Sequence, residues 1–375
     1  MSKAAELAKA GEVMQTGQLG GRRNFIYNGA MQIAQRSASV TGITGAGYHT
    51  LDRWNSNISS FGTWTQTQST DVPAGEGFTT SLKMDVTTAE GSPAAADTAQ
   101  VRQLFEGQDL QRLKYGTSNA ENITLSFWVK ATKTGVNVVT LYQDDAEKQI
   151  SGTYTIGTTN TWEYKTITFV GNTADVMTND ATRGFICVWH LGSGSNRTEG
   201  TLRTVWTAYT DADEAVGQVN HGDSTSNDWL LTGVQMEIGS QATNFEHRSF
   251  GEELLLCQRY CTVHNMSGDA DEYVIPYSQG QVDSTNRAEI HILYPEKRAA
   301  PTITVTNPTN FKVMTGANTA ITASGFSGAL VGTGIHGANL FWGVSSGVAV
   351  NDHTGNIKNI YLFQNTGAIK IDAEL

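Results

Sequence analysis

The sequence predicts a mainly β protein built from packed antiparallel sheets, with little helix. The chain of 375 residues contains 39 glycines and 6 prolines, and charged residues make up 16 % of it. Many short segments alternate between apolar and polar residues, as half-buried strands do, and turns that contain Gly or Asn separate them. Strands do not alternate with long helices, so a parallel nucleotide-binding sheet is not expected.

The main domain boundary is predicted in the stretch from residue 230 to residue 260. Alternation over 230–238 indicates a strand, and Gly239 ends the pattern. The segment 250–261 has helical spacing, with two glutamates near its start and an arginine near its end, as the helix dipole favours. We therefore divide the chain into residues 1–23, 24–248 and 249–375.

Residues 1–23 are expected to form a short helix and a flexible joint. Leu7 and Val13 belong to an apolar set with helical spacing, and Gly-Gly-Arg-Arg follows at 20–23. An isolated helix of this length is marginal in water. We expect an anchor that docks on another protein or on sister chains; the alternative is a disordered terminus.

The middle part is expected to be one large β-domain. In the segment 123–131, Thr124, Ser126 and Trp128 alternate with apolar residues, and the segment 163–170 alternates in the same way. Two packed antiparallel sheets accommodate this number of strands. The predicted strands are 63–70, 81–87, 99–105, 123–131, 136–143, 151–156, 163–170, 183–191, 201–209 and 229–238.

The last part is expected to hold the helix and a smaller β-domain, with a terminal strand that pairs within the fold. Cys257 and Cys261 are one helical turn apart, which favours packing as small apolar residues over metal binding. Three cysteines do not make a disulfide framework. The predicted strands are 273–277, 288–294, 302–306, 311–314, 320–326, 339–344, 357–365 and 369–375.

Charge and hydropathy exclude several classes of function. The net charge of −11 and the lack of a Lys/Arg run argue against binding to a nucleic-acid backbone. No run of about 18 apolar residues is present, so no membrane span is expected. The first residues lack the apolar core of a signal peptide, so we expect synthesis and assembly in the cytosol.

A set of short motifs runs from residue 28 to residue 260. They are Asn28-Gly29 with Gln35-Arg36, Asp52-Arg53-Trp54, Ser-Phe-Trp-Val-Lys-Ala at 126–131, Gln-x-Glu-x-Gly at 235–239, Ala-Thr-x-Phe-Glu-x-Arg at 242–248, which contains Glu246 and Arg248, and Glu-Leu-x-x-Cys-Gln-Arg-Tyr at 253–260. Together they resemble a family of bacteriophage virion proteins that is common in marine phages. The resemblance covers roughly residues 24 to 261, and the remainder more loosely.

The resemblance implies a jelly-roll β-sandwich similar to carbohydrate-binding modules. It implies a non-enzymatic virion structural protein, most simply a tail-fibre or adhesin component anchored by its N-terminus and presenting the sandwich to host surface glycans. The partners are then other virion proteins, sister chains in a homo-oligomer such as a trimer, and host glycans. The alternatives are a capsid head fibre or decoration protein without a receptor role, and a glycan-degrading tail spike. The tail spike needs a carboxylate pair, and none can be assigned.

Tryptophan is the residue type most relevant to glycan binding. Seven of the eight tryptophans lie in the middle part. Exposed aromatic rings pack against the C–H faces of sugars, whereas buried ones fill the core between sheets. Trp189, His190, Trp206 and Tyr209 lie beside polar loops and are the candidate platform residues. Trp128 stands among apolar residues and is predicted to be in the core.

The Asp52-Arg53-Trp54 motif is expected to be structural. An ion pair between Asp52 and Arg53 would clamp a turn beside the Trp54 ring. Glu246 and Arg248 are assigned to the same structural motif from the resemblance.

Acidic loops and two enzyme-like motifs complete the candidates. The loops at 144–147, 211–214 and 269–272 are expected to be solvated turns; a structural Ca²⁺ is the alternative, although the spacing does not match an EF-hand. The glycine motif at 332–337 is followed by a predicted strand instead of the helix that a dinucleotide needs. The Gly-x-Ser-x-Gly motif at 343–347 precedes an adjacent Asp352 and His353, unlike the distant acid and base of a hydrolase. No catalytic residue or metal ligand is assigned.

Overall fold

The structure is a computed structural model that describes residues 22–265, 273–274, 279–284, 287–307, 311–314, 320–326, 333–344, 356–357, 359–362 and 367–375. The chain forms two compact units, the first extending to Glu253 and the second spanning Leu254–Glu374. The division falls inside the helix α2 (Phe250–Gln258), just beyond the boundary predicted at residue 249. None of the described helices has the length and apolar character needed to cross a membrane. The predicted anchor with Leu7 and Val13 lies outside the described residues.

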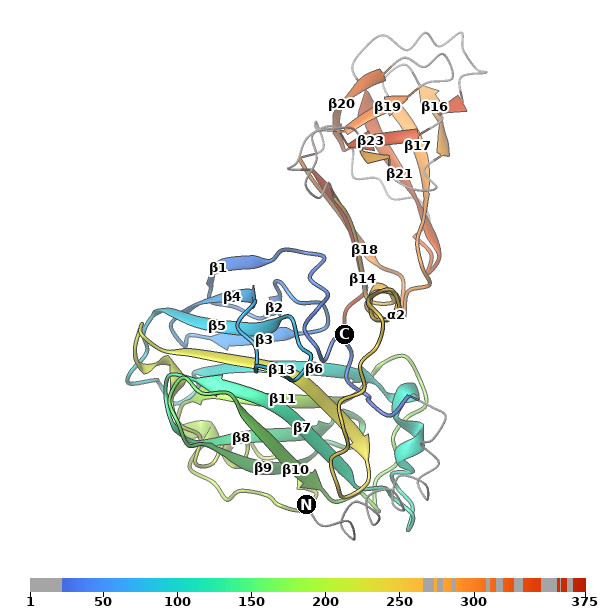
Figure 1. The fold of residues 1–375 in the computed structure, drawn as a ribbon. Coiled ribbons are helices and arrows are strands. Elements are labelled where there is room, and N and C mark those ends of the chain that lie inside the picture. Colours follow the sequence, from blue (N-terminus) through green and yellow to red (C-terminus); the bar gives the residue numbers. More distant parts are fainter. Residues whose placement is uncertain are drawn as a thin grey trace. The chain divides into compact units, whose positions relative to one another are not determined.

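The first unit is a two-sheet β-sandwich (Figure 1). Its sheets have the strand orders β1-β4-β5-β13-β7-β10 and β12-β9-β8-β11-β6-β3-β2, and the pairs are antiparallel. The strands are β1 (Ser39–Ile43), β2 (Gly47–Tyr48), β3 (Asn55–Ser59), β4 (Thr63–Ser69), β5 (Ser81–Thr88), β6 (Thr98–Glu106), β7 (Ile123–Ala131), β8 (Gly135–Gln143), β9 (Lys148–Ile156), β10 (Glu163–Phe169), β11 (Arg183–Ser193), β12 (Thr207–Ala208) and β13 (Asp228–Ile238).

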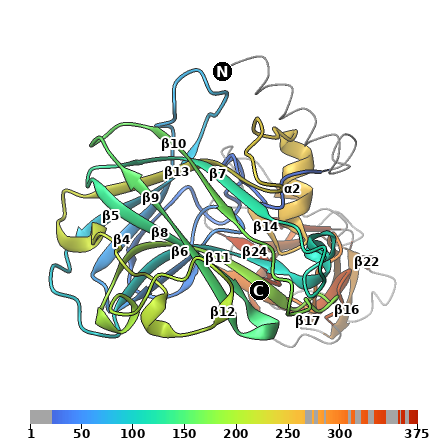
Figure 2. The same ribbon diagram turned by 90° about the horizontal axis from the view of Figure 1, so that it is seen from below.

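The chain passes repeatedly from one sheet to the other, as in jelly-roll sandwiches. β5 is followed by β6 in the opposite sheet, and β7 returns to the first sheet. Strands β7, β10 and β13 of one sheet lie over β8, β9 and β11 of the other (Figure 2). The large buried core between the sheets contains Phe127 from β7, Trp189 from β11 and Trp229 from β13. The mainly β, sandwich-like fold predicted from the sequence is therefore confirmed.

Most predicted strands of the first unit appear within one to three residues of their expected ends. The strand predicted at 201–209 is wrong, because only Thr207–Ala208 is extended and paired. Polar side chains hold this segment instead: Asp213 accepts hydrogen bonds from the Thr201 amide and from Arg203. The strands β1, β2 and β3 were not predicted, since their sequences are short and polar.

The motif residues form a buried polar clamp that joins the two ends of the first unit. Trp54 Nε1 donates to the backbone oxygen of Asn28 at 3.1 Å, and the backbone N–H of Asn28 donates to the Glu253 carboxylate at 2.6 Å. Arg248 pairs with Glu253 at 3.4 Å and donates to the backbone oxygens of Asn24 and Ile26. Residues 24–54 are thus tied to residues 248–253 through buried charges and carbonyls.

Asp52 and Arg53 both contact residues elsewhere in the chain, and an ion pair between the two stays a prediction. Asp52 pairs with Arg36 at 3.4 Å and accepts hydrogen bonds from Gln35. Arg53 is fully buried, has a positive φ of 71° and donates to the backbone oxygen of Leu104.

The second unit contains a three-stranded sheet of order β14-β24-β18 and an eight-stranded sheet of order β15-β23-β19-β20-β21-β17-β16-β22. The predicted terminal strand is confirmed as β24, which pairs with β14 and β18. Helix α2 ends at Gln258, so Cys261 begins β14 instead of ending the helix; both Cys257 and Cys261 are buried. The strands are β14 (Cys261–Asn265), β15 (Tyr273–Val274), β16 (Gln279–Ser284), β17 (Arg287–Leu293), β18 (Thr302–Thr306), β19 (Phe311–Met314), β20 (Ala320–Phe326), β21 (Gly337–Val344), β22 (Asn356–Ile357), β23 (Asn359–Leu362) and β24 (Ala368–Asp372).

Candidate functional site

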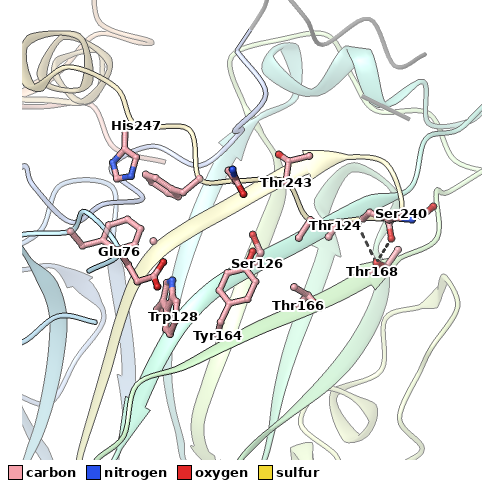
Figure 3. A pocket seen from close by; sticks show the side chains of 16 residues that line it. Glu76, Thr124, Ser126, Trp128, Tyr164, Thr166, Thr168, Ser240, Thr243 and His247 are labelled. Atoms are coloured by element: carbon pink, nitrogen blue, oxygen red, sulfur yellow. Dashed lines mark hydrogen bonds between the residues drawn. The ribbon is translucent and has the colours of Figure 1, made fainter. Parts of the chain in front are cut away.

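A groove of about 760 Å³ lies on the outer face of the sheet that contains β7, β10 and β13 (Figure 3). This volume is in the range of small-molecule and oligosaccharide sites. It is lined by Glu76, Phe78, Thr124, Ser126, Trp128, Tyr164, Thr166, Thr168, Gly233, the segment Ser240–Phe245 and His247.

The floor of the groove is made by the outward side chains of two neighbouring strands. In β7 the residues Thr124, Ser126 and Trp128 face outward, while their neighbours enter the core. Thr166 and Tyr164 face outward from β10, and Tyr164 is 45 % exposed. The rings of Trp128 and Tyr164 lie side by side, with centroids 5.4 Å apart and an interplanar angle of 50°. They form an aromatic pair at the surface of the sheet.

Three further rings form one wall of the groove. Phe78 packs against Phe245 at a centroid distance of 5.0 Å and against His247 at 5.3 Å. Gly233 in β13 lies beneath them with a positive φ of 61°. A Cβ at this position would lie 2.6 Å from the Phe78 ring and 3.1 Å from that of Trp128. Glycine is therefore required for both rings to approach the strand.

The loop Ser240–Asn244, which forms the other wall, is held by partly buried hydrogen bonds. The amide and hydroxyl of Thr243 donate to Glu237 at 2.8 and 2.6 Å. Glu246 accepts from the amides of Arg23 and Asn24, both at 2.7 Å, and Arg23 also donates to Thr243 at 2.9 Å. Arg23, expected to belong to a flexible joint, instead helps to fix this wall.

The polar groups of the groove are mainly hydroxyls and amides. Thr166, Thr168, Ser240, Gln241 and Asn244 are exposed. Such groups can donate to and accept from sugar hydroxyls. Figure 3 shows the hydrogen bond between the hydroxyls of Thr124 and Thr168, at 3.1 Å, and the one that Thr168 donates to the Ser240 backbone oxygen, at 3.3 Å.

Charge is sparse among the lining residues. They include one carboxylate, that of Glu76, and neither Lys nor Arg. Partial burial raises the pKa of the Tyr164 hydroxyl above its ordinary value, so this group is a neutral donor. The second nearby carboxylate, Glu237, is fully buried and its oxygens are bonded to Thr243 and Gln235. The lining therefore does not supply the pair of carboxylates that glycoside hydrolysis needs.

Two of the predicted platform residues are inaccessible, which corrects the prediction for them. Trp189 is fully buried and packs against Trp54 and Phe127, with centroids 5.4 and 5.9 Å away. His190 is fully buried on the other face of β11 and lies 3.3 Å from the Thr140 hydroxyl. A side chain without exposed surface cannot stack on a sugar.

Buried histidines predict a loss of stability in acid. Burial lowers the pKa of His190 to about 3 and that of His221 to about 4; Lys133 adds to the effect at His221, while Asp223 and Asp228 oppose it. The unfolded chain binds these protons near pH 6.5 and the folded chain does not, so stability falls as the pH drops from about 6.5 to 4. The slope is at most about 1.4 kcal/mol per pH unit for each histidine.

Urea unfolding at pH 7 and pH 4.5 checks this, with His221→Gln as the variant. His221 Nε2 lies 2.6 Å from Asn137 Oδ1, and the glutamine amide retains a donor for that oxygen. We expect the variant to lose less stability than the unmodified protein over this pH range. His247→Gln, at an exposed position, is the matched control. An unchanged pH dependence in His221→Gln would contradict the assignment.

The other two predicted platform residues are partly exposed but lie outside the groove. Trp206 packs against Tyr115 and Phe185 and donates to the Val170 backbone oxygen at 2.7 Å. The Tyr209 hydroxyl donates to Asp211 at 2.5 Å, and its ring contacts Tyr142. The structure does not bring these two together with Trp128 and Tyr164.

The aromatic pair of the groove is not among the residues predicted from the sequence, and the prediction that Trp128 belongs to the core is wrong. The signal was available, because Trp128 shares its side of the strand with Thr124 and Ser126. Phe245 and Thr243 also belong to the motif at 242–248, in which the sequence assigns a role, a structural one, to Glu246 and Arg248 alone.

The acidic loops are engaged with protein groups. Asp144 pairs with Arg183 at 2.8 Å, and Asp213 pairs with Arg203 at 2.6 Å. Within the described residues, His, Cys, Asp and Glu nowhere gather in a group that could hold a metal ion. The loop at 269–272 and the motif residues Ser345, Asp352 and His353 lie outside the described residues. The glycine motif ending at Gly337 is followed by β21, a strand, as predicted.

Comparisons with known proteins found no matching family model and no matching curated protein. Solved structures with some likeness include a tailspike protein 4 domain of bacteriophage CBA120, at 15 % identity, 58 % coverage of this chain, 21 % coverage of that one and a TM-score of 0.31. A second is the carbohydrate-binding module TmCBM61 in complex with β-1,4-galactotriose, at 10 % identity, 58 % and 100 % coverage and a TM-score of 0.30. A third is the baseplate tripod of bacteriophage Tuc2009, at 10 % identity, 74 % and 85 % coverage and a TM-score of 0.26. The virion family stays a prediction from the motifs.

Proposed function

We propose that this chain is a non-enzymatic structural component of a phage particle, of the tail-fibre or adhesin type, whose first unit binds neutral glycan chains. The observation that carries the glycan-binding part is the groove, where the Trp128–Tyr164 pair lies among hydroxyl and amide groups. Sugar rings present C–H faces to aromatic rings and hydroxyls to polar side chains, and the groove offers both. The virion context rests on the sequence motifs.

The charge of the groove selects the class of glycan. An anionic sugar needs cationic partners, and the lining holds Glu76 but neither Lys nor Arg. Uronate or sulfate groups would be repelled by Glu76. Neutral hexose or pentose polymers fit the lining better. Weak single sites of this kind gain strength when several copies act together on one surface.

Native gel electrophoresis with dissolved polysaccharides tests this proposal. The net charge of −11 drives the protein toward the anode near pH 7. We expect at least one neutral polysaccharide among a mannan, a galactan, a xylan and a β-glucan to retard the protein, and alginate or carrageenan to leave its mobility unchanged. Unchanged mobility in all the neutral gels, or retardation in the anionic gels alone, would refute the proposal.

A further inference from the structure

A second hollow, of about 320 Å³, lies where β10 ends. Lys148, Asn172, Asp175, Val170, Val205 and Trp206 are among the residues that line it. Val170 is 44 % exposed and Val205 is 57 % exposed, so this is an apolar surface with polar groups beside it. Neither valine contributes to the hydrophobic core of the sandwich.

One row of side chains connects the groove with this hollow. Along β10 and the residue after it, the exposed positions are Tyr164, Thr166, Thr168 and Val170, and the positions between them are less exposed or buried. Thr168 lines the groove and Val170 lines the hollow. Two residues of extended chain span about 7 Å, and the whole row spans about 20 Å. No other continuous stretch of the chain supplies lining residues to both sites.

The Trp206 ring is fixed at the far end of this row. Its Nε1 donates to the backbone oxygen of Val170 at 2.7 Å, and its ring packs against Tyr115 and Phe185. Its remaining surface lines the hollow. Lys148 and Asp175 provide a donor and an acceptor beside the ring, the combination that sugar hydroxyls require.

We propose that the groove and the hollow are two parts of one binding path along β10, with the Trp128–Tyr164 pair at one end and Trp206 at the other. The ligand is then a neutral polysaccharide long enough to contact both at once, and a single sugar or a disaccharide occupies the groove alone. This inference rests on the proposed function and adds the length of the ligand to it.

Calorimetric titration with oligosaccharides of increasing length tests the path. The probes are the disaccharide, tetrasaccharide, hexasaccharide and octasaccharide of whichever neutral polysaccharide retards the protein. Trp206→Ala should weaken binding of the octasaccharide about tenfold, as for a truncated aromatic contact, and change disaccharide binding less than about twofold. Trp128→Ala should weaken binding of both.

Trp206 also packs on the core, so Trp206→Ala could lose binding because the protein misfolds. A second variant distinguishes misfolding from a lost contact. Val205→Asp changes an exposed side chain of the hollow and should reproduce the selective loss for the octasaccharide. Val136→Asp, at a valine that is 42 % exposed and lines neither site, is the matched control.

The outcomes separate the two proposals. The extended path is wrong if Trp206→Ala and Val205→Asp leave octasaccharide binding unchanged, or if they weaken disaccharide and octasaccharide binding equally. The groove still stands in that case when Trp128→Ala weakens the binding of both probes. If Trp128→Ala has no effect on any probe, the groove itself is wrong. If no neutral polysaccharide is bound at all, the proposed function and the path fail together.

Discussion

Replacing Arg248 by alanine is expected to lower the free energy of unfolding of the first unit by about 3–5 kcal/mol. The Arg248 and Glu253 side chains are 4 % and 9 % exposed, and Arg248 also donates to the backbone oxygens of Asn24 and Ile26. Alanine leaves a carboxylate and two carbonyls buried without this donor, which is costly in a low-dielectric interior. Urea unfolding followed by tryptophan fluorescence measures the change, since seven of the eight tryptophans lie in the first unit.

The matched control is the exposed ion pair beside it. Arg22 pairs with Glu252 at 2.7 Å, and the two side chains are 47 % and 39 % exposed. Arg22→Ala should cost less than about 1 kcal/mol. Arg248→Lys keeps the charge but loses the planar fork, so its stability should lie between those of Arg248→Ala and the unmodified protein. Equal costs for Arg22→Ala and Arg248→Ala would show that the buried clamp does not join the ends of the unit.

Replacing Trp128 by alanine is expected to weaken binding of a neutral polysaccharide ten- to about a hundredfold, with little change in stability. Its ring faces outward beside Tyr164 and lines the groove, so the truncation removes a stacking surface and leaves the core intact. Titration calorimetry gives the affinity, and urea unfolding gives the stability.

Trp162→Ala is the control for this substitution. Trp162 is also partly exposed and donates to Asp71 at 2.9 Å, but it does not line the groove. It should leave the affinity within about twofold of the unmodified protein. If both variants lose affinity equally, the loss reports a general effect of removing surface tryptophans, and the groove loses its main support.

Alternation was the signal that made most of the sandwich predictable. The residue types of β7 and β10 alternate in this way. In β10 the exposure alternates along most of the strand, whereas in β7 the outward Thr124 and Ser126 are buried as well. β3 has the sequence Asn-Ser-Asn-Ile-Ser, and Ile58 is its one residue in the hydrophobic core. The polar residues before it bond to polar side chains of β4 and β6. The strand predicted at 201–209 is wrong for the opposite reason, because its residues are typical of strands but ion pairs hold the segment as a loop. These pairs are Arg203 with Asp213 and Arg197 with Glu214.

The candidate site was harder to predict because it depends on which face of a strand stays uncovered. Trp128 and Trp189 both stand in strands rich in apolar residues. The Trp128 side chain points to the outer face of its sheet and the Trp189 side chain points to the core, and this difference alone separates the partly exposed ring from the buried one. The His190 side chain also points to the outer face of its sheet, yet it is fully buried. Exposure on a sheet face is decided by long-range packing, which local sequence does not report. The wall made by residues 240–244 depends on contacts with Arg23, more than 200 positions earlier in the chain.

The position of β13 has a consequence for biosynthesis. β13 lies between β5 and β7 in its sheet, although residues 228–238 are made long after both neighbours. A nascent chain therefore carries two unpaired strand edges on the ribosome until residue 238 has emerged, and such edges favour aggregation. In the second unit β24, near the C-terminus, lies between β14 and β18 in the same way. Prematurely released chains lack one or both of these central strands, so they present open strand edges to chaperones and proteases. Strand pairs between residues far apart in the sequence also make folding slow.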